Sequence, residues 1–325
     1  MIPESILGRI IQSSGIEDER IVRLDILSVY LLQALSEAGM FKHMCFKGGN
    51  SLRKIFARRP SRFSLDLDFV DASYEQLTDT GLTASDYYLE LLEHIDERTI
   101  YDINWRVISL SDPELAAGSV RFDIHYFVYD DKPEQGWQSR ADNVLAFECS
   151  LRRPVLLPKE IRELRTESWF KHLEFTPAPI PVLRLEEAAA EKVRAAFQRN
   201  NARDIYDLYQ YGQLVFDSAL VRRAAVLKCW QDRGLYNGAT NFDPVEFLAK
   251  LTPANYVWDG LKDQVAIHAW IKPAELLANV SQRYSFLSEI TEPEKELCQD
   301  RWQKKQNLHD QLWAELRDAS QAIKN

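Results

Sequence analysis

Residues 46–52 read FKGGNSL and residues 63–70 read FSLDLDFV, and these two stretches decide the fold of the N-terminal half. The apolar run at residues 44–46 is long enough for a buried strand, and residues 52–57 have a helical pattern. In residues 63–70 hydrophobic side chains alternate with polar ones, which predicts a second strand with its aspartates on one face. The sequence therefore predicts a strand, a glycine turn, a helix and a strand, in that order.

The glycine turn suits the binding of phosphate. Gly48 and Gly49 let the backbone approach a ligand closely, and the start of the following helix adds partial positive charge. Asn50 and Ser51 add polar side chains at the same turn, and Arg53 adds a cation just beyond it. We therefore predict that these five residues bind a nucleotide.

The aspartates of the second strand predict a metal site. Asp66 and Asp68 share a face of the strand, where two carboxylates repel each other unless a cation neutralises them. Mg²⁺ prefers such oxygen ligands and commonly takes one or two carboxylates together with substrate phosphates. A third carboxylate on a neighbouring strand would hold a second ion, and Asp123 is the candidate, with an ordinary hydrogen-bonded strand aspartate as the alternative. We expect Asp66 and Asp68 to be catalytic, and all three aspartates to bind Mg²⁺.

The remaining sequence alternates strands and helices before it becomes helical. We expect helices at residues 19–38 and 85–97, and strands near residues 103–110, 119–128 and 143–151. From Pro158 onward the pattern is helical, with two helices at residues 185–198 and 203–211 joined by a short polar turn. The predicted fold is α/β (α+β), with a mixed-sheet core domain at residues 1–157 and an α-helical domain at residues 158–325.

The composition predicts a globular protein without a membrane span. The chain has 325 residues, of which 46% are hydrophobic, enough for a full core. It contains no window of 18 uninterrupted apolar residues, and its start lacks the pattern of a signal peptide. Its four cysteines lie too far apart for a paired zinc site and are typical of buried thiols in a reducing compartment. We expect a cytoplasmic protein.

Positive charge is local rather than general in this chain. The formal net charge is −9 and the pI is about 5.3, which argues against nucleic-acid binding by overall charge. Residues 53–62, beside the glycine turn, nevertheless contain five basic residues and no acidic one: Arg53, Lys54, Arg58, Arg59 and Arg62. We expect this run to face the phosphates of an RNA.

The two N-terminal motifs together resemble those of the nucleotidyltransferase AbiEii/AbiGii toxin family. Residues 187–199 support the resemblance because Lys192 matches the lysine motif of the family, and residues 202–208 contain its Arg-Asp-x-x-Asp motif. One departure is Asn50, where many members have Ser or Thr, so the resemblance leaves open whether Asn50 or the serine after it contacts phosphate. The resemblance extends over roughly residues 20–215 and leaves the C-terminal hundred residues unassigned.

The resemblance implies a polymerase-β-like nucleotidyltransferase fold with a helical C-terminal region that contributes lysine and aspartate to the cleft. It implies an Mg²⁺-dependent toxin of a bacterial abortive-infection toxin–antitoxin system, neutralised by a cognate antitoxin. The substrates would be an NTP, the donor of an NMP group, and an acceptor, for which we expect the 3′ end of a tRNA.

The helical motifs also have a chemical rationale. Helices joined by four residues pack against each other, so Lys192 and Asp204 are expected to converge on one cleft. Lys192 would neutralise triphosphate charge, and Asp204 would orient it or take a proton from the attacking group. The alternative is that Asp204 caps the second helix while Asp207 makes a structural ion pair. We favour the ion pair for Asp207, and we assign Lys192 and Asp204 to catalysis, with Lys192 also binding the nucleotide.

Other functions remain compatible with the same residues. The NMP group is transferred to a protein hydroxyl in one variant of the hypothesis. A metal-dependent nuclease would use the clustered carboxylates equally well, but it has no use for a triphosphate cradle. A non-catalytic binding module is a third hypothesis, against which the intact Asp66, Asp68 and Lys192 argue.

Overall fold

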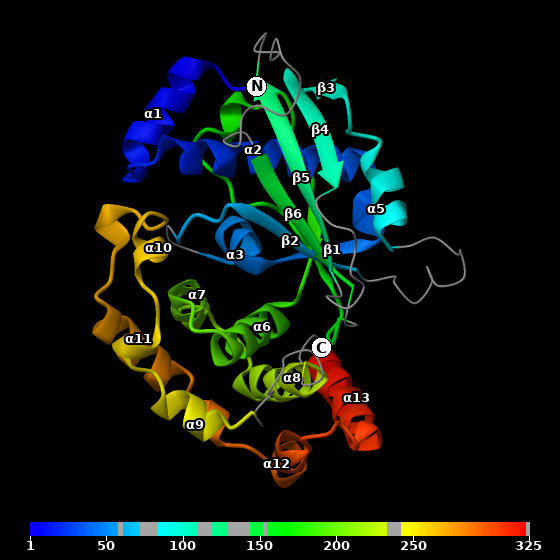
Figure 1. The fold of residues 1–325 in the computed structure, drawn as a ribbon, viewed down its shortest axis with the longest axis vertical. Coiled ribbons are helices and arrows are strands. Elements are labelled where there is room, and N and C mark those ends of the chain that lie inside the picture. The colour runs from blue at the N-terminus through cyan, green and yellow to red at the C-terminus, as the bar shows by residue number, and fades with distance from the viewer. Residues whose placement is uncertain are drawn as a thin grey trace.

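The computed structural model describes residues 1–57, 61–71, 84–109, 119–128, 144–151, 155–232 and 242–322. Within these residues eight strands form one mixed sheet, in the order β3-β4-β5-β6-β2-β1-β8-β7. Figure 1 shows the sheet in the upper part of the molecule and the helices of the C-terminal half gathered below it. The mixed α/β fold expected from the sequence is confirmed.

The eight strands of the sheet lie between Met44 and Val182. They are β1 (Met44–Lys47), β2 (Asp66–Asp71), β3 (Arg98–Ile100), β4 (Ile103–Ser109), β5 (Ser119–Val128), β6 (Val144–Ser150), β7 (Glu160–Arg162) and β8 (Ile180–Val182). β1 pairs antiparallel with β2 and parallel with β8, and β2 pairs parallel with β6. The three strands predicted after the aspartate motif are confirmed as β4, β5 and β6, while the predicted ends at Leu110 and Asn143 lie outside the described residues.

The glycine turn follows β1 and itself begins a helix. α3 (Gly48–Ser51) continues into a π-helical turn, Leu52–Phe56, before the chain returns as β2. The predicted order of strand, turn, helix and strand is confirmed, although the helix begins at Gly48 rather than at Leu52. The second strand begins at Asp66 rather than at Phe63, because the Phe63 amide donates to the Gln264 carbonyl at 2.7 Å instead of to a strand.

The two faces of the sheet differ sharply in polarity. On one face the rings of Phe46, Phe69, Phe147 and Phe122 pack in sequence across β1, β2, β6 and β5, with centroid distances of 5.3, 5.0 and 6.0 Å. These rings are buried, and helix α2 (Glu19–Glu37) runs behind the sheet in Figure 1. Because side chains alternate along a strand, the polar residues between these rings lie on the other face.

The sheet continues beyond the boundary expected at residue 157. β7 and β8 pair with each other, and β8 pairs with β1, so the helical part of the chain begins only at Leu185. The prediction that the chain is helical from Pro158 was wrong for residues 158–184. The reason is length: β8 is the three-residue run Ile-Pro-Val, which is fully buried but too short to show a period.

The helical half of the chain packs around one central helix. The helices are α6 (Leu185–Gln198), α7 (Ala202–Gly212), α8 (Ser218–Gln231), α9 (Pro244–Ala249), α10 (Asp259–Lys262), α11 (Pro273–Arg283), α12 (Glu292–Gln299) and α13 (Gln306–Ala322). α8 packs against α6, α12 and α13, while α7 packs against α6 and α11. The predicted helices at residues 185–198 and 203–211 are therefore confirmed as α6 and α7, within one residue at each end.

Helices α1 (Glu4–Ser14), α2 and α5 (Ala84–Leu92) complete the N-terminal half. α2 begins after Asp18, whose side chain accepts from the amide of Arg20, and it spans the predicted range to within one residue. α5 ends at Leu92, five residues before the predicted end. In the part of the chain that the structure describes, no helix has the length and apolar character needed to cross a bilayer.

Candidate active site

The glycine turn lies directly against the second aspartate of the strand motif. Gly48 has a φ of +79°, a conformation that residues with a Cβ rarely adopt. A Cβ on Gly48 would lie 2.0 Å from Asp68 Oδ2, so a side chain there would collide with the carboxylate. The register of the sheet explains this proximity, because Lys47, the residue before Gly48, is the cross-strand neighbour of Asp68. The expected proximity of the glycine turn to the acids is therefore confirmed.

The polar side chains of the turn are directed into the protein. The Asn50 side-chain amide donates to the Asp66 carbonyl at 3.0 Å and to the Ser64 carbonyl at 3.4 Å. Asn50 and Ser51 are both buried, with 1% and 0% of their surface exposed. A Cβ on Gly49 would lie 2.4 Å from Arg62 Nη2. Asn50 thus ties the turn to the start of β2, which leaves backbone groups as the part of the turn that can meet a ligand.

Asp66 and Asp68, the acid pair, carry negative charge that the protein only partly neutralises. The Ser64 hydroxyl donates to Asp66 Oδ1 at 2.6 Å and so fixes that carboxylate. Burial and the neighbouring Asp66 charge raise the pKa of Asp68 to about 7, and Glu148 adds to the rise. Lys47 opposes it. Two adjacent carboxylates whose charge is only partly neutralised provide hard oxygen ligands for a divalent cation.

The sheet register places two further carboxylates on the face of the acid pair. Asp123 of β5 pairs with Ala146 of β6, which in turn pairs with Asp66, so one strand separates the two aspartates. Glu148 of β6 is the direct cross-strand neighbour of Asp68. Glu148 is therefore closer in the sheet to the acid pair than Asp123, and it was missed because the sequence does not show which strands are adjacent.

Glu148 has a partner on the neighbouring strand. Its carboxylate lies 2.9 Å from Arg121 Nη2, and both side chains are at least one-third exposed. Asp123 is partly buried, and burial raises its pKa. Among the described residues there is no group of three or more His, Cys, Asp or Glu side chains arranged to hold a metal ion. The acid pair alone thus fits the pattern of one or two protein carboxylates completed by substrate phosphates.

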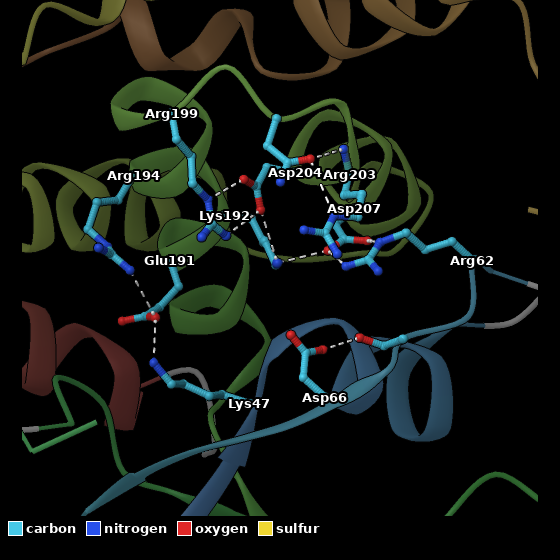
Figure 2. Close-up of polar contacts among 12 residues, drawn as sticks. Lys47, Arg62, Asp66, Glu191, Lys192, Arg194, Arg199, Arg203, Asp204 and Asp207 are labelled. Carbon is cyan, nitrogen blue, oxygen red and sulfur yellow. Dashed lines mark hydrogen bonds and ion pairs between the residues drawn. The ribbon is translucent and has the colours of Figure 1, made fainter. Parts of the chain in front are cut away.

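Helices α6 and α7 form the opposing wall of the site. Lys192 Nζ lies 3.2 Å from Asp204 Oδ1 and 2.8 Å from Asp207 Oδ2, which confirms that the lysine and aspartate motifs converge. Figure 2 shows Lys192, Asp204 and Asp207 above Asp66, on helices that face the strand. The two walls are electrostatically coupled, because Lys192 lowers the pKa of Asp68.

The opposing wall is a continuous chain of ion pairs whose carboxylates, Asp204 and Asp207, are buried. Arg62 donates to both oxygens of Asp207 at 2.8 Å, and Arg199 donates to both oxygens of Asp204 at 2.6 and 2.9 Å. Burial would raise the pKa of Asp204, but Lys192 and Arg199 bring it down to about 2. Burial would lower the pKa of Lys192, but Asp207 and Asp204 hold it above its ordinary value. All of these groups are therefore charged at neutral pH.

Two details of this wall resolve alternatives left by the sequence. Asp204 does not cap α7, because the cap is Asn201, whose side chain accepts from the Arg203 amide at 3.0 Å. Asp207 makes the expected ion pair, with Arg62 as well as Lys192. Arg62 was counted only as part of a basic run, yet it links the glycine turn to α7.

Arg53 and Lys54, from the same basic run as Arg62, form ion pairs with Asp25 of helix α2. The Arg53 guanidinium donates to Asp25 at 2.9 and 3.1 Å and to the Ser61 carbonyl at 3.1 Å, and it stacks on the Phe63 ring. Lys54 also donates to Asp25, at 2.9 Å. Both basic side chains are buried. The expectation that this run faces RNA phosphates is therefore wrong for Arg53, Lys54 and Arg62, whose charges are paired with buried aspartates. Arg58 and Arg59 lie outside the described residues.

A second ionic cluster joins α6, α8 and β1. Glu187 accepts from the backbone amides of Leu156 and Leu157 at 2.8 Å and pairs with Lys228 at 2.6 Å. Lys228 also pairs with Glu191 at 2.8 Å, and Glu191 in turn contacts Lys47. This cluster holds the helical half against the chain that leaves β6.

The arrangement of sheet, glycine turn and facing helices is that of a nucleotidyltransferase. A family model described as nucleotidyl transferase AbiEii toxin, type IV toxin–antitoxin system, matches residues 30–310, and the chain therefore belongs to the AbiEii toxin family. The match extends well past residue 215, so the C-terminal helices left unassigned by the sequence are part of the family structure. The protein is a nucleotidyltransferase toxin of a type IV toxin–antitoxin system.

A solved structure supports this assignment over nearly the whole chain. The chain is similar to MenT4, a nucleotidyltransferase toxin from Mycobacterium tuberculosis, with 25% sequence identity and a TM-score of 0.76. The similarity covers 98% of this chain and 100% of that one. No curated protein matches the chain.

Proposed function

We propose that the protein is an Mg²⁺-dependent enzyme that transfers an NMP group from an NTP to the 3′ end of a tRNA. The observation that carries the proposal is the contact between Gly48 and the Asp68 carboxylate, with Lys192 of α6 lying above Asp66 in Figure 2. A phosphate-binding turn, an acid pair and a lysine on opposite walls can hold a triphosphate between them.

Asp66 and Asp68 would hold the metal ion. Burial and the neighbouring Asp66 charge, which raise the Asp68 pKa to about 7, disfavour the charged pair, and a bound cation would offset both effects. Mg²⁺ would neutralise phosphate charge and polarise the α-phosphorus towards attack. For a second ion we propose a third carboxylate from the same face of the sheet, either Asp123, as the sequence suggests, or Glu148, which the register places nearer.

The reaction forms one bond to phosphorus and breaks another. The acceptor hydroxyl oxygen attacks the α-phosphorus and releases its proton to water. The bond from the α-phosphorus to the bridging oxygen of the β-phosphate breaks, and pyrophosphate leaves. Lys192 would stabilise the negative charge that builds up on the phosphates. A carboxylate with a pKa near 2 is a poor proton acceptor at neutral pH, so we assign Asp204 the role of orienting Lys192.

The acceptor is proposed to be RNA because the toxin family favours it and because one basic side chain is exposed at the rim of the site. Arg199, on the turn between α6 and α7, is 60% exposed although its guanidinium contacts Asp204. It can therefore meet an RNA phosphate at the rim of the site. We also propose a cytoplasmic location and a role in abortive infection of phage-infected cells. The type IV toxin–antitoxin description of the family supports a cognate antitoxin as partner.

Labelled nucleotides test the proposal. The purified protein is incubated with each α-labelled NTP and Mg²⁺, together with either total RNA or total cell protein, and with EDTA in a parallel reaction. We expect label in the tRNA fraction, none with EDTA, and none with Lys192→Ala. Label found in protein would show that the acceptor is a protein hydroxyl rather than RNA. Degraded RNA without incorporated label would indicate a nuclease.

A further inference from the structure

Lys47 is the last residue of β1 and immediately precedes the glycine turn. Its cross-strand neighbour is Asp68, so its side chain lies on the face of the acid pair. The same row across the sheet continues through Glu148 to Arg121. Lys47 therefore lies between the turn, the acid pair and helix α6.

The ion pair between Lys47 and Glu191 is weak. Its Nζ lies 3.5 Å from Glu191 Oε2, at the long end of an ion pair, and its side chain is 19% exposed. Glu191 also pairs with Lys228 at 2.8 Å and with Arg194 at 3.5 Å, so it stays neutralised without Lys47. Figure 2 shows Lys47 reaching from the strand towards Glu191 on the helix above.

Lys192 makes shorter ion pairs than Lys47. Its Nζ is held at 3.2 and 2.8 Å by two aspartates, Asp204 and Asp207, both of them almost fully buried. Release of Lys192 would leave both carboxylates with one cation fewer in a buried site. Release of Lys47 leaves Glu191 with two cations. Lys47 is thus free to move to a ligand at a lower cost.

Lys47 also lies close to the acid pair. Its cross-strand pairing with Asp68 places its charge beside that carboxylate, in the region where the phosphates of a metal-bound nucleotide would lie. A cation at this position attracts an anion that arrives at the acid pair together with a metal ion.

We propose that Lys47 is a binding residue for the polyphosphate of the NTP and exchanges its contact with Glu191 for one with the phosphates when the nucleotide binds. This inference rests on the proposed nucleotidyl transfer and adds to it a second phosphate-binding lysine, one held by the strand rather than by the helices. Lys192 keeps its aspartates and provides fixed charge, while Lys47 provides the mobile cation.

Nucleotide binding by Lys47→Met tests the proposal, because methionine retains most of the aliphatic stem and removes only the charge. The full-length protein is titrated with the NTP, NDP and NMP of one base in the presence of Mg²⁺. Lys42→Ala is the matched control, since it removes an exposed lysine of the turn before β1 at the same change in net charge. Lys47→Arg, which keeps the positive charge, is the conservative variant.

Loss of a charged hydrogen bond predicts that Lys47→Met binds NTP about 10- to 100-fold more weakly than wild type. We expect a smaller loss for NDP, the smallest for NMP, partial recovery in Lys47→Arg and no change in Lys42→Ala. A loss equal for all three nucleotides would overturn the proposal and assign Lys47 a structural role, as would wild-type NTP affinity in a folded Lys47→Met. If Lys47→Met has a lower melting temperature than wild type, the same titrations with Lys47→Arg test the proposal. A residue that binds the polyphosphate should alter the affinity for NTP more than the affinity for NDP or NMP. Absence of NTP binding by wild type would instead refute the proposed function itself.

Discussion

Gly48 and Asp68 are in such close contact that a methyl group on Gly48 would lie 2.0 Å from the Asp68 Oδ2 atom. The turn that is proposed to bind phosphate and the carboxylate proposed to bind metal are thus one packed unit. Neither can change shape without moving the other.

Gly48→Ala should damage both stability and activity. A φ of +79° costs an L-residue about 1–2 kcal/mol, and the new methyl group would displace the Asp68 carboxylate. We expect a lower melting temperature and loss of most nucleotidyl transfer. The matched control is Gly8→Ala in α1, where a Cβ meets nothing within 4 Å and helix propensity predicts a gain of about 0.5–1 kcal/mol. Wild-type transfer rates in Gly48→Ala would argue against the contact.

The raised pKa of Asp68 predicts a distinctive dependence on pH. Its folded pKa of about 7 lies above the ordinary 3.8, so between these values the folded protein binds more protons than the unfolded chain. The contribution of this group to stability therefore falls as pH rises from about 4 to about 7. Mg²⁺ should restore stability above pH 7, where the carboxylate is charged.

Thermal unfolding at pH 6 and pH 8, with and without Mg²⁺, checks this expectation. Wild type should be stabilised by Mg²⁺ more at pH 8 than at pH 6, and Asp68→Asn should show little stabilisation at either pH. The acidic limb of kcat/KM should lie near pH 7 in wild type and should move to higher pH in Lys47→Met, because Lys47 lowers the Asp68 pKa. An identical response of Asp68→Asn and wild type to Mg²⁺ would exclude Asp68 as a ligand.

Asp207→Asn should be among the most destabilising single changes in the helical half. Asp207 is fully buried and accepts from both Arg62 and Lys192, which would be left as buried cations short of a partner. Breaking such a pair costs about 3–5 kcal/mol. The control is Glu246→Gln, which breaks the exposed pair with Lys250 and should change the free energy of unfolding by less than about 0.5 kcal/mol. Equal denaturant midpoints for the two variants would contradict the described network.

Glu148→Gln and Asp123→Asn separate the two candidates for a third carboxylate. The register predicts that Glu148→Gln lowers kcat by about 10-fold or more, as for groups that tune a metal site, and that Asp123→Asn has the smaller effect. Glu148→Gln should also shift the acidic limb to lower pH, because Glu148 raises the Asp68 pKa. The reverse order of activities would assign the role to Asp123.

Gln264→Ala tests how the C-terminal region is coupled to the site. The Gln264 side chain accepts from Arg62 Nη1 at 3.1 Å, and its backbone carbonyl accepts from the Phe63 amide. Removal of the side-chain acceptor should destabilise the protein by about 1–2 kcal/mol and lower kcat, since Arg62 holds Asp207. Gln311→Ala, on an exposed face of α13, is the control and should leave both unchanged. An unchanged kcat in Gln264→Ala would show that the contact between Gln264 and Arg62 does not affect catalysis.

The parts of the fold that repeat a pattern over several residues could be predicted from the sequence. The alternation around Asp66 and Asp68 gave β2, and the helical spacing gave α2, α6 and α7. β8 could not be predicted, because three buried residues have no period and its place beside β1 depends on tertiary pairing.

The candidate site could be predicted only where its residues are close in sequence or share a motif. Asp66 and Asp68 are two residues apart, and Lys192 and Asp204 belong to helices joined by a short turn. Glu148 required knowledge of the strand order, which no local pattern contains. Arg62 required knowledge that a residue 145 positions away would bury its carboxylate against it.

Incubation with NTP labelled at either the α- or the γ-phosphate, with purified tRNA and Mg²⁺, tests NMP transfer by this site. Wild type and Asp66→Ala are run in parallel. We expect wild type to place the α-label on the tRNA and to release the γ-label in pyrophosphate, while Asp66→Ala does neither. Transfer of the γ-label, or α-labelling by Asp66→Ala at the wild-type rate, would contradict this expectation.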